Sequence, residues 1–103
     1  MSSGTINAPI PMIIGNYQIA GSSSKTLHIA NSTRGFFVTG NSSVTAKAIG
    51  VFHVTSAGAT SVSLMNNPTG VTVTTGTNTI TVANGTSFVL FVTFFMTDGN
   101  PPT

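Results

Sequence analysis

Hydrophobic and polar residues alternate along most of this chain in short blocks. In the block 25–30, Leu27 and Ile29 fall on one side, and Thr26 and His28 fall on the other. This two-residue period is typical of a β-strand with one buried face. Gly, Ser, Asn and Pro residues separate such blocks about every eight to twelve residues, which is the spacing of short antiparallel strands joined by turns.

The predicted strands share this alternation and are flanked by turn residues. They cover residues 17–20, 25–30, 35–39, 44–56, 61–65, 71–75, 79–83 and 87–96. Within the longest of them, Gly50 indicates a β-bulge or a close approach of another group to the backbone. The many Thr and Val residues disfavour helix and favour a pleated sheet. We therefore expect an all-β fold, a small antiparallel β-sandwich or jelly-roll-like barrel of about eight short strands, over residues 16–97.

The segment 87–96, SFVLFVTFFM, is the most hydrophobic stretch of the chain. A transmembrane helix needs about 20 apolar residues, so this stretch is too short to span a membrane as a helix. Read as a strand, it is apolar on both faces. One face can pack against the protein's own second sheet, and the other would be a large exposed patch. We predict that identical chains or the N-terminal segment cover this second face, at Val89, Phe91 and Phe95. The alternative is a central strand of a monomeric sandwich, shielded by loops.

The dipeptide Asn84-Gly85 is a strong hairpin signal, because both residues tolerate positive φ. It predicts that the strand 79–83 pairs directly with the strand 87–96. A three-residue loop places Ile80 opposite Phe88, whereas a two-residue loop places it opposite Val89. The sequence does not decide between these registers, because a slip of one residue exchanges the two faces.

The first 15 residues form a predicted extended arm. Pro9 and Pro11 fix their own φ and bias the preceding residues toward extended conformations. The arm lacks the charged and uninterrupted apolar regions of a signal peptide. Its apolar content is high for a free tail, and we expect it to dock on its own domain or on a partner, where it would serve as the attachment element. The predicted attachment residues are Ile6, Ile10, Met12, Ile13 and Ile14. At the other end, residues 98–103 are predicted to be an irregular tail.

Charged residues make up only 4% of the chain, against about 25% in an ordinary soluble protein. The complete set is Lys25, Arg34, Lys47 and Asp98. Three scattered basic residues do not form the cluster that nucleic-acid binding requires. A single carboxylate cannot form a catalytic pair, and the absence of Cys excludes a thiol nucleophile. We expect neither an enzyme nor a cofactor site.

The two histidines lie in different predicted strands. The plain interpretation is that His28 and His53 face solvent or a partner. The alternative is an ion held on a symmetry axis, where one His from each subunit supplies a ligand.

Two segments carry a resemblance to a known class of proteins. They are NYQIAGSSSKTLHIANSTRGFFVTG, from residue 16 to 40, and VTVTTGTNTITVANGTSFVLFVTFF, within 71–96. Both resemble the small Thr-, Ser-, Gly- and Asn-rich β-modules of phage and prophage tail-fibre and other virion-appendage proteins. The resemblance implies a homotrimer on a phage particle, in contact with other virion proteins. It also implies assembly in the host cytoplasm and action outside the cell.

Three hypotheses follow for the function. The first is a non-enzymatic virion structural protein, such as a phage fibre, head-fibre or capsid decoration subunit, which is attached by its arm and could contact a host surface glycan. The second is a carbohydrate-binding or adhesin module that uses Tyr17 as its aromatic platform. The third is a self-assembling subunit of a bacterial surface, which would form open filaments.

Overall fold

The fold is seen in a computed structural model that describes residues 12–42, 46–66 and 68–98. All of its long regular elements are β-strands, which confirms the predicted all-β class and the number of strands. The strands are β1 (Ile13–Ile19), β2 (Ser23–His28), β3 (Arg34–Gly40), β4 (Ala48–Val54), β5 (Thr60–Leu64), β6 (Val71–Gly76), β7 (Thr79–Asn84) and β8 (Leu90–Thr97).

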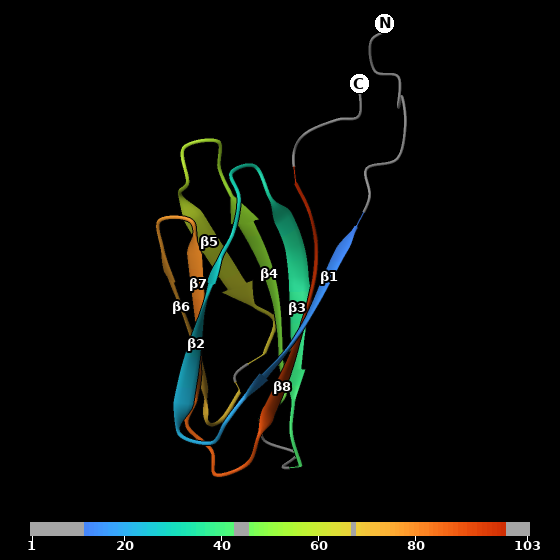
Figure 1. Ribbon diagram of the computed structural model, residues 1–103, viewed down its shortest axis with the longest axis vertical. Helices are drawn as coiled ribbons and strands as arrows, with labels where there is room; N and C mark the ends of the chain where they lie inside the picture. The colour runs from blue at the N-terminus through green and yellow to red at the C-terminus, as the bar shows by residue number, and fades with distance from the viewer. Residues whose placement is uncertain (1–11, 43–45, 67, 99–103) are drawn as a thin grey trace, which may run out of the picture.

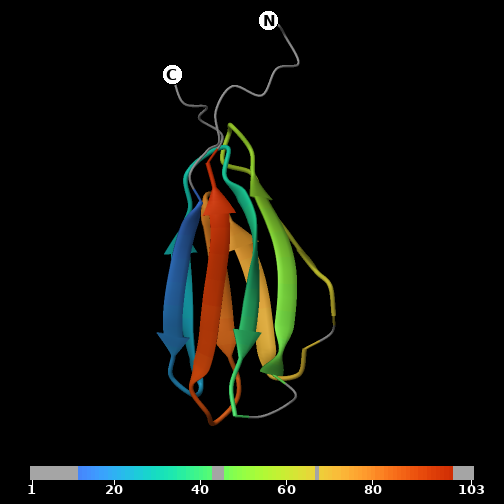
Figure 2. The same cartoon turned by 90° about the vertical axis from the view of Figure 1, so that its right-hand side faces the viewer.

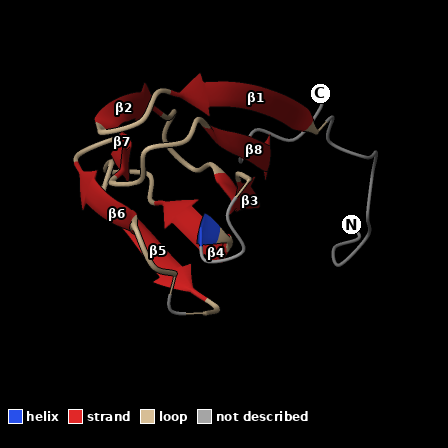
Figure 3. Ribbon diagram, turned by 90° about the horizontal axis from the view of Figure 1, so that it is seen from below, coloured by secondary structure: helices blue, strands red, loops and turns tan. Residues whose placement is uncertain are grey.

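The strands form two antiparallel sheets packed face to face. One sheet has five strands in the order β1-β8-β3-β4-β5, and the other has three in the order β2-β7-β6. Figure 1 shows the two layers from the side, and Figure 2 shows β1, β8, β3 and β4 next to one another in the larger sheet. Seen along its length in Figure 3, the two layers form an open sandwich. Of the two predicted architectures, the structure is thus the sandwich.

The core lies between the sheets because each strand turns alternate side chains inward. In β4, Phe52 and Val54 are buried whereas Val51 and His53 are exposed. The ring of Phe94 lies at the centre of this core. Its partners surround it on several sides: Phe37 is stacked at 5.1 Å between ring centroids, Phe52 meets it edge-on at 5.5 Å, and Tyr17 meets it edge-on at 6.2 Å.

The predicted hairpin between residues 79–83 and 87–96 is wrong in both of its registers. β7 pairs with β2 and β6, whereas β8 pairs with β1 and β3 in the other sheet. The Asn84-Gly85 connection therefore crosses between the layers. The physical reason is that Ile80, Val82 and the inner face of β8 are all apolar and face each other across the core. This arrangement buries more apolar surface than a hairpin with β7 and β8 side by side in one sheet. Asn84 itself is buried at the end of β7, with 1% of its surface exposed, and its side chain donates hydrogen bonds to the carbonyl oxygens of Ile19 in β1 and of Phe88 in the connection to β8.

Several predicted boundaries shift by a few residues. β1 begins at Ile13, so residues 13–15 of the predicted arm belong to the sandwich, and β8 begins at Leu90 instead of Ser87. The strand predicted for 44–56 is described over Ala48–Val54, and residues 43–45 lie outside the described part. Gly50 has a regular register opposite Phe37. It is a site of close approach and not a bulge, because a Cβ there would collide with the Phe37 ring.

Both ends of the described chain lie at the same end of the sandwich. Ile13 at the start of β1 is opposite Met96 near the end of β8, and this is the upper end in Figure 1. We call it the chain-end side. The opposite end, which we call the distal end, carries the connections β1–β2, β3–β4, β5–β6 and β7–β8.

Candidate interaction surface

The outer face of the five-stranded sheet is apolar, although it faces away from the core. At its centre, Phe36 of β3 lies between Phe95 of β8 and Val51 of β4 in the strand register. Val38 lies between Thr93 and Ile49 in the next row. We use the term apolar face for the set Ile14, Phe36, Val38, Ile49, Val51, Met65 and Phe95.

The side chains of the apolar face are exposed, and two of them are packed against each other. The rings of Phe36 and Phe95 are stacked, with centroids 4.8 Å apart and planes at 18°. Phe36 nevertheless keeps 43% of its surface exposed, and Val51 keeps 49%. Beside the stacked pair lies an open hollow of about 680 Å³, which Ile49 and Met65 also line. A cluster of large, exposed apolar side chains such as this one usually marks a site of interaction with another molecule.

The rim of the apolar face on the chain-end side is basic. Arg34 of β3 is opposite His53 of β4 in the register, and both side chains line the hollow. The guanidinium of Arg34 donates hydrogen bonds to the carbonyl oxygens of Ser32 and Asp98, both at 3.5 Å. The only acidic residue of the chain, Asp98, follows the last strand. None of the residues that line the hollow is acidic.

The outer face of the three-stranded sheet is different, because hydroxyl groups cover it. Thr26 of β2 and Thr81 of β7 are neighbours in the register, and their hydroxyls are hydrogen-bonded at 2.9 Å. Thr74 of β6 extends the same row and is exposed. Hydroxyl groups can bond to water, so this face needs no covering partner. The two outer faces of the sandwich thus have opposite character.

Of the residues predicted for the interface, Phe91 and Phe95 lie on the outer side of β8 and Val89 is exposed just before it, whereas Leu90 and Val92 on the alternate side of the strand are buried. The prediction of two apolar faces, one turned to the core, is therefore confirmed. Phe95 belongs to the apolar face. Val89 and Phe91 lie beyond it toward the distal end, where Phe91 is opposite Gln18 of β1.

Most of the apolar face was not predicted from the sequence, because only the segment 87–96 was recognised as a strand with two apolar faces. A similar signal was present in 35–39, where Phe36 and Phe37 are consecutive, and in 48–52, where Ile49 and Val51 alternate with core residues. When both faces of a strand are apolar, only one of them can pack into the core, and the other remains exposed on the outside of the sheet.

Other predicted sites have less support from the geometry. Tyr17 points toward the core side, meets Phe94 edge-on and lies below the Lys25 ammonium at 5.5 Å, so it is not an exposed platform. His28 and His53 lie in different sheets. The described residues contain no group of three or more potential metal-ligating side chains. Nor do they form a helix long and apolar enough to cross a membrane.

Part of the predicted arm is placed by the structure. Met12, Ile13 and Ile14 are exposed at the chain-end side, and Ile14 contributes to the apolar face. Ile6 and Ile10 lie outside the described residues, as does the predicted tail after Asp98.

Comparisons with known proteins give a structural neighbour but no sequence relative. No protein-family model matches the sequence, and no curated protein matches it either. The fold is similar to part of a tailspike protein, gp49, from the Acinetobacter baumannii bacteriophage Fri1, described as a capsular polysaccharide depolymerase. The TM-score is 0.58 at 16% identity, over 87% of this chain and 17% of the tailspike. At this identity the similarity is one of fold, and the chain spans only a small part of the tailspike's length.

Proposed function

We propose that this chain is a non-enzymatic structural subunit of a phage particle that assembles with copies of itself through the apolar face. Two independent observations support the proposal. The first is the fold, which a phage tailspike also contains. The second, which carries the proposal, is an apolar outer face on a chain with almost no charge.

The size of the apolar face favours a stable protein partner. Six of its seven side chains keep between 37% and 67% of their surface exposed. Together they present on the order of 500 Å² of apolar surface, since a large apolar side chain contributes roughly 100–200 Å² when fully exposed. With a polar rim, this approaches the roughly 800 Å² that each partner contributes to a standard interface.

A second copy of the chain is the partner that best fits this surface. The residues of the apolar face carry no charge, so another apolar surface is the appropriate complement, and each copy carries one. A homotrimer with the three apolar faces turned toward a common axis would cover this face in every copy. Closed symmetry of this kind leaves no apolar face exposed, whereas an open arrangement would continue as a filament.

The attachment point is proposed at the chain-end side. Met12 and Asp98 both leave the sandwich there, next to the start of β1 and the end of β8. Attachment to other virion proteins by the N-terminal arm would direct the distal end outward, toward a host surface. Because β1 begins at Ile13, a deletion of residues 1–11 should leave a folded sandwich that no longer joins the particle. Normal incorporation of this truncated protein would contradict the attachment role.

The assembly proposal is tested by the solution mass, measured by light scattering. The wild-type protein should have three times the mass of one chain. Val51→Lys places a charge at the centre of the apolar face and should give a folded monomer. Thr74→Lys is the matched control, because Thr74 is equally a strand residue but on the hydroxyl face; it should keep the wild-type mass.

Two outcomes would overturn the assembly proposal: a wild-type protein that stays monomeric at every concentration, or a V51K variant that keeps the wild-type mass. A mass that grows without limit as concentration rises would instead favour the self-assembling surface subunit.

A further inference from the structure

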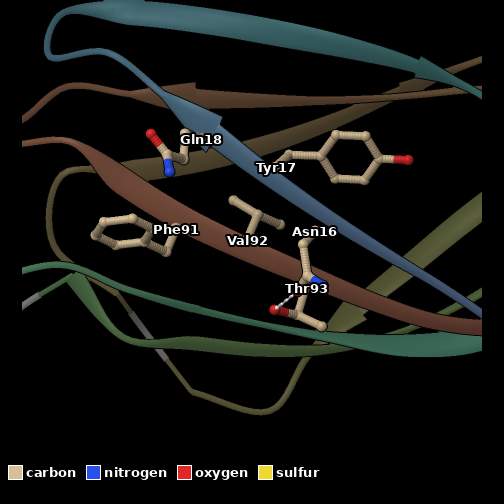
Figure 4. Close-up of a pocket in the computed structure, with 6 residues that line it drawn as sticks. All are labelled: Asn16, Tyr17, Gln18, Phe91, Val92 and Thr93. Atoms are coloured by element: carbon tan, nitrogen blue, oxygen red, sulfur yellow. Dashed lines mark hydrogen bonds between the residues drawn. The ribbon is translucent and has the colours of Figure 1, made fainter.

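A second recess adjoins the apolar face on the same outer side of the five-stranded sheet, between β1 and β8. Its volume is about 270 Å³, and Figure 4 shows its side chains. The lining residues are Asn16, Tyr17, Gln18, Phe91, Val92 and Thr93. None of them is charged, so the recess is suited to a neutral ligand.

One wall of the recess is the ring of Phe91, which keeps 52% of its surface exposed. In the register, Phe91 has Gln18 of β1 on one side and Gly40 of β3 on the other. A Cβ added at Gly40 would meet no atom within 4 Å. The space over this glycine is therefore open, and a flat apolar group can reach the ring from that side.

Amide groups lie next to the ring. The Thr93 hydroxyl donates a hydrogen bond to the Asn16 side-chain oxygen at 2.8 Å. The Asn16 amide nitrogen donates to no other residue in the described part of the chain, so its protons can bond to another acceptor. The Gln18 amide bonds to no side chain or backbone group in the described part of the chain, and in Figure 4 it lies alongside the Phe91 ring. The recess thus combines an accessible aromatic ring with amides that can both donate and accept.

We propose that this recess binds a neutral saccharide. A pyranose ring has one face of C–H groups, which can pack on Phe91, and a rim of hydroxyls, which can bond to the amides of Gln18 and Asn16. The volume limits the site to about one sugar ring, because sites for larger ligands span roughly 300–1,000 Å³. Binding to one copy is expected in the millimolar range, and several copies on one particle would raise the avidity.

This inference deepens the proposed function, since it supplies a ligand class for host contact. It reassigns Phe91, for which the sequence suggested an oligomer interface, to ligand binding. It does not require assembly, because all lining residues come from a single chain.

The experiment is a titration of ¹⁵N-labelled V51K monomer with methyl glycosides of glucose and galactose and with N-acetylglucosamine and N-acetylgalactosamine. At least one of these probes should shift the side-chain amide signals of Gln18 and Asn16. Adding Phe91→Ala should weaken that binding by roughly 2- to 12-fold, the loss expected for an aromatic packing contact. Phe88→Ala is the matched control, because Phe88 is also 52% exposed but does not line the recess; it should leave the affinity unchanged.

The proposal is overturned if none of the four probes moves the two amide signals, or if F88A weakens binding as much as F91A does. Its failure can be distinguished from failure of the assembly proposal. A wild-type trimer whose V51K monomer binds no sugar would remove only the saccharide site, whereas a monomeric wild type that binds sugar would remove only the assembly.

Discussion

The side chain of Asn84 offers the sharpest test of how this sandwich is held together. Its amide nitrogen lies 3.0 Å from the carbonyl oxygen of Ile19, 3.2 Å from that of Ala20 and 2.7 Å from that of Phe88. Its oxygen accepts from the Thr86 backbone N–H at 3.0 Å and from the Thr86 hydroxyl at 2.7 Å. One buried amide thereby joins the β1–β2 turn to the β7–β8 crossover.

Asn84→Ala removes all of these bonds and leaves carbonyl groups unsatisfied. The amide has two protons for three carbonyls, so about four hydrogen bonds are lost at once. At roughly 1 kcal/mol for each, and with some carbonyls regaining water, the free energy of unfolding should fall by about 2–4 kcal/mol. In a domain of this size that lowers the Tm by roughly 10–25 °C.

The assay is equilibrium unfolding in urea, followed by circular dichroism at one fixed protein concentration, because the midpoint of an oligomer depends on concentration. Asn66→Ala is the control. Asn66 also makes two backbone hydrogen bonds, to Ile49 and Lys47, but it is exposed. Water can replace those bonds, so the control should lose about 1 kcal/mol or less. Equal losses of unfolding free energy in the two variants would refute the reasoning that burial makes the hydrogen bonds of Asn84 more stabilising than those of Asn66.

Three further predictions concern the fold and use the same assay. Gly50→Ala should destabilise the protein by about 1–3 kcal/mol, because the new methyl group collides with the Phe37 ring, whereas Gly40→Ala should be near neutral; equal effects would contradict the close approach. Asn78 has φ +56° and donates two side-chain hydrogen bonds. Both variants lose these bonds, but only Ala is strained at positive φ, so Asn78→Ala should lower the free energy of unfolding by about 1 kcal/mol more than Asn78→Gly. The reverse order would refute the strain at this position. Phe52→Ala should lower the free energy of unfolding by about 3–5 kcal/mol. A loss smaller than that of Gly50→Ala would be inconsistent with the place of Phe52 in the core.

The strand alternation could be read from the sequence because it is a local property. Where one phase of a strand was apolar, as with Leu27 and Ile29, the pattern identified the inward face, and Ile29 is buried in the structure. The two-faced character of 87–96 could also be read, and it correctly indicated a surface beyond the core. The candidate surface was only partly predictable, because Phe36 and Val51 become its centre only when β3 and β4 are placed beside β8.

The sequence by itself determined the class of the fold, the number of strands and the low content of charged residues. Tertiary structure alone decided which strands are neighbours. The dipeptide Asn84-Gly85 carries a local preference for a hairpin, worth little energy, whereas placing β8 between β1 and β3 buries Leu90, Val92 and Phe94 against the opposite sheet. Burial of large apolar side chains contributes about 1.5–3 kcal/mol each and outweighs the turn preference. That choice of neighbours also aligned the apolar residues of four strands on one outer face, which no single segment of the sequence displays.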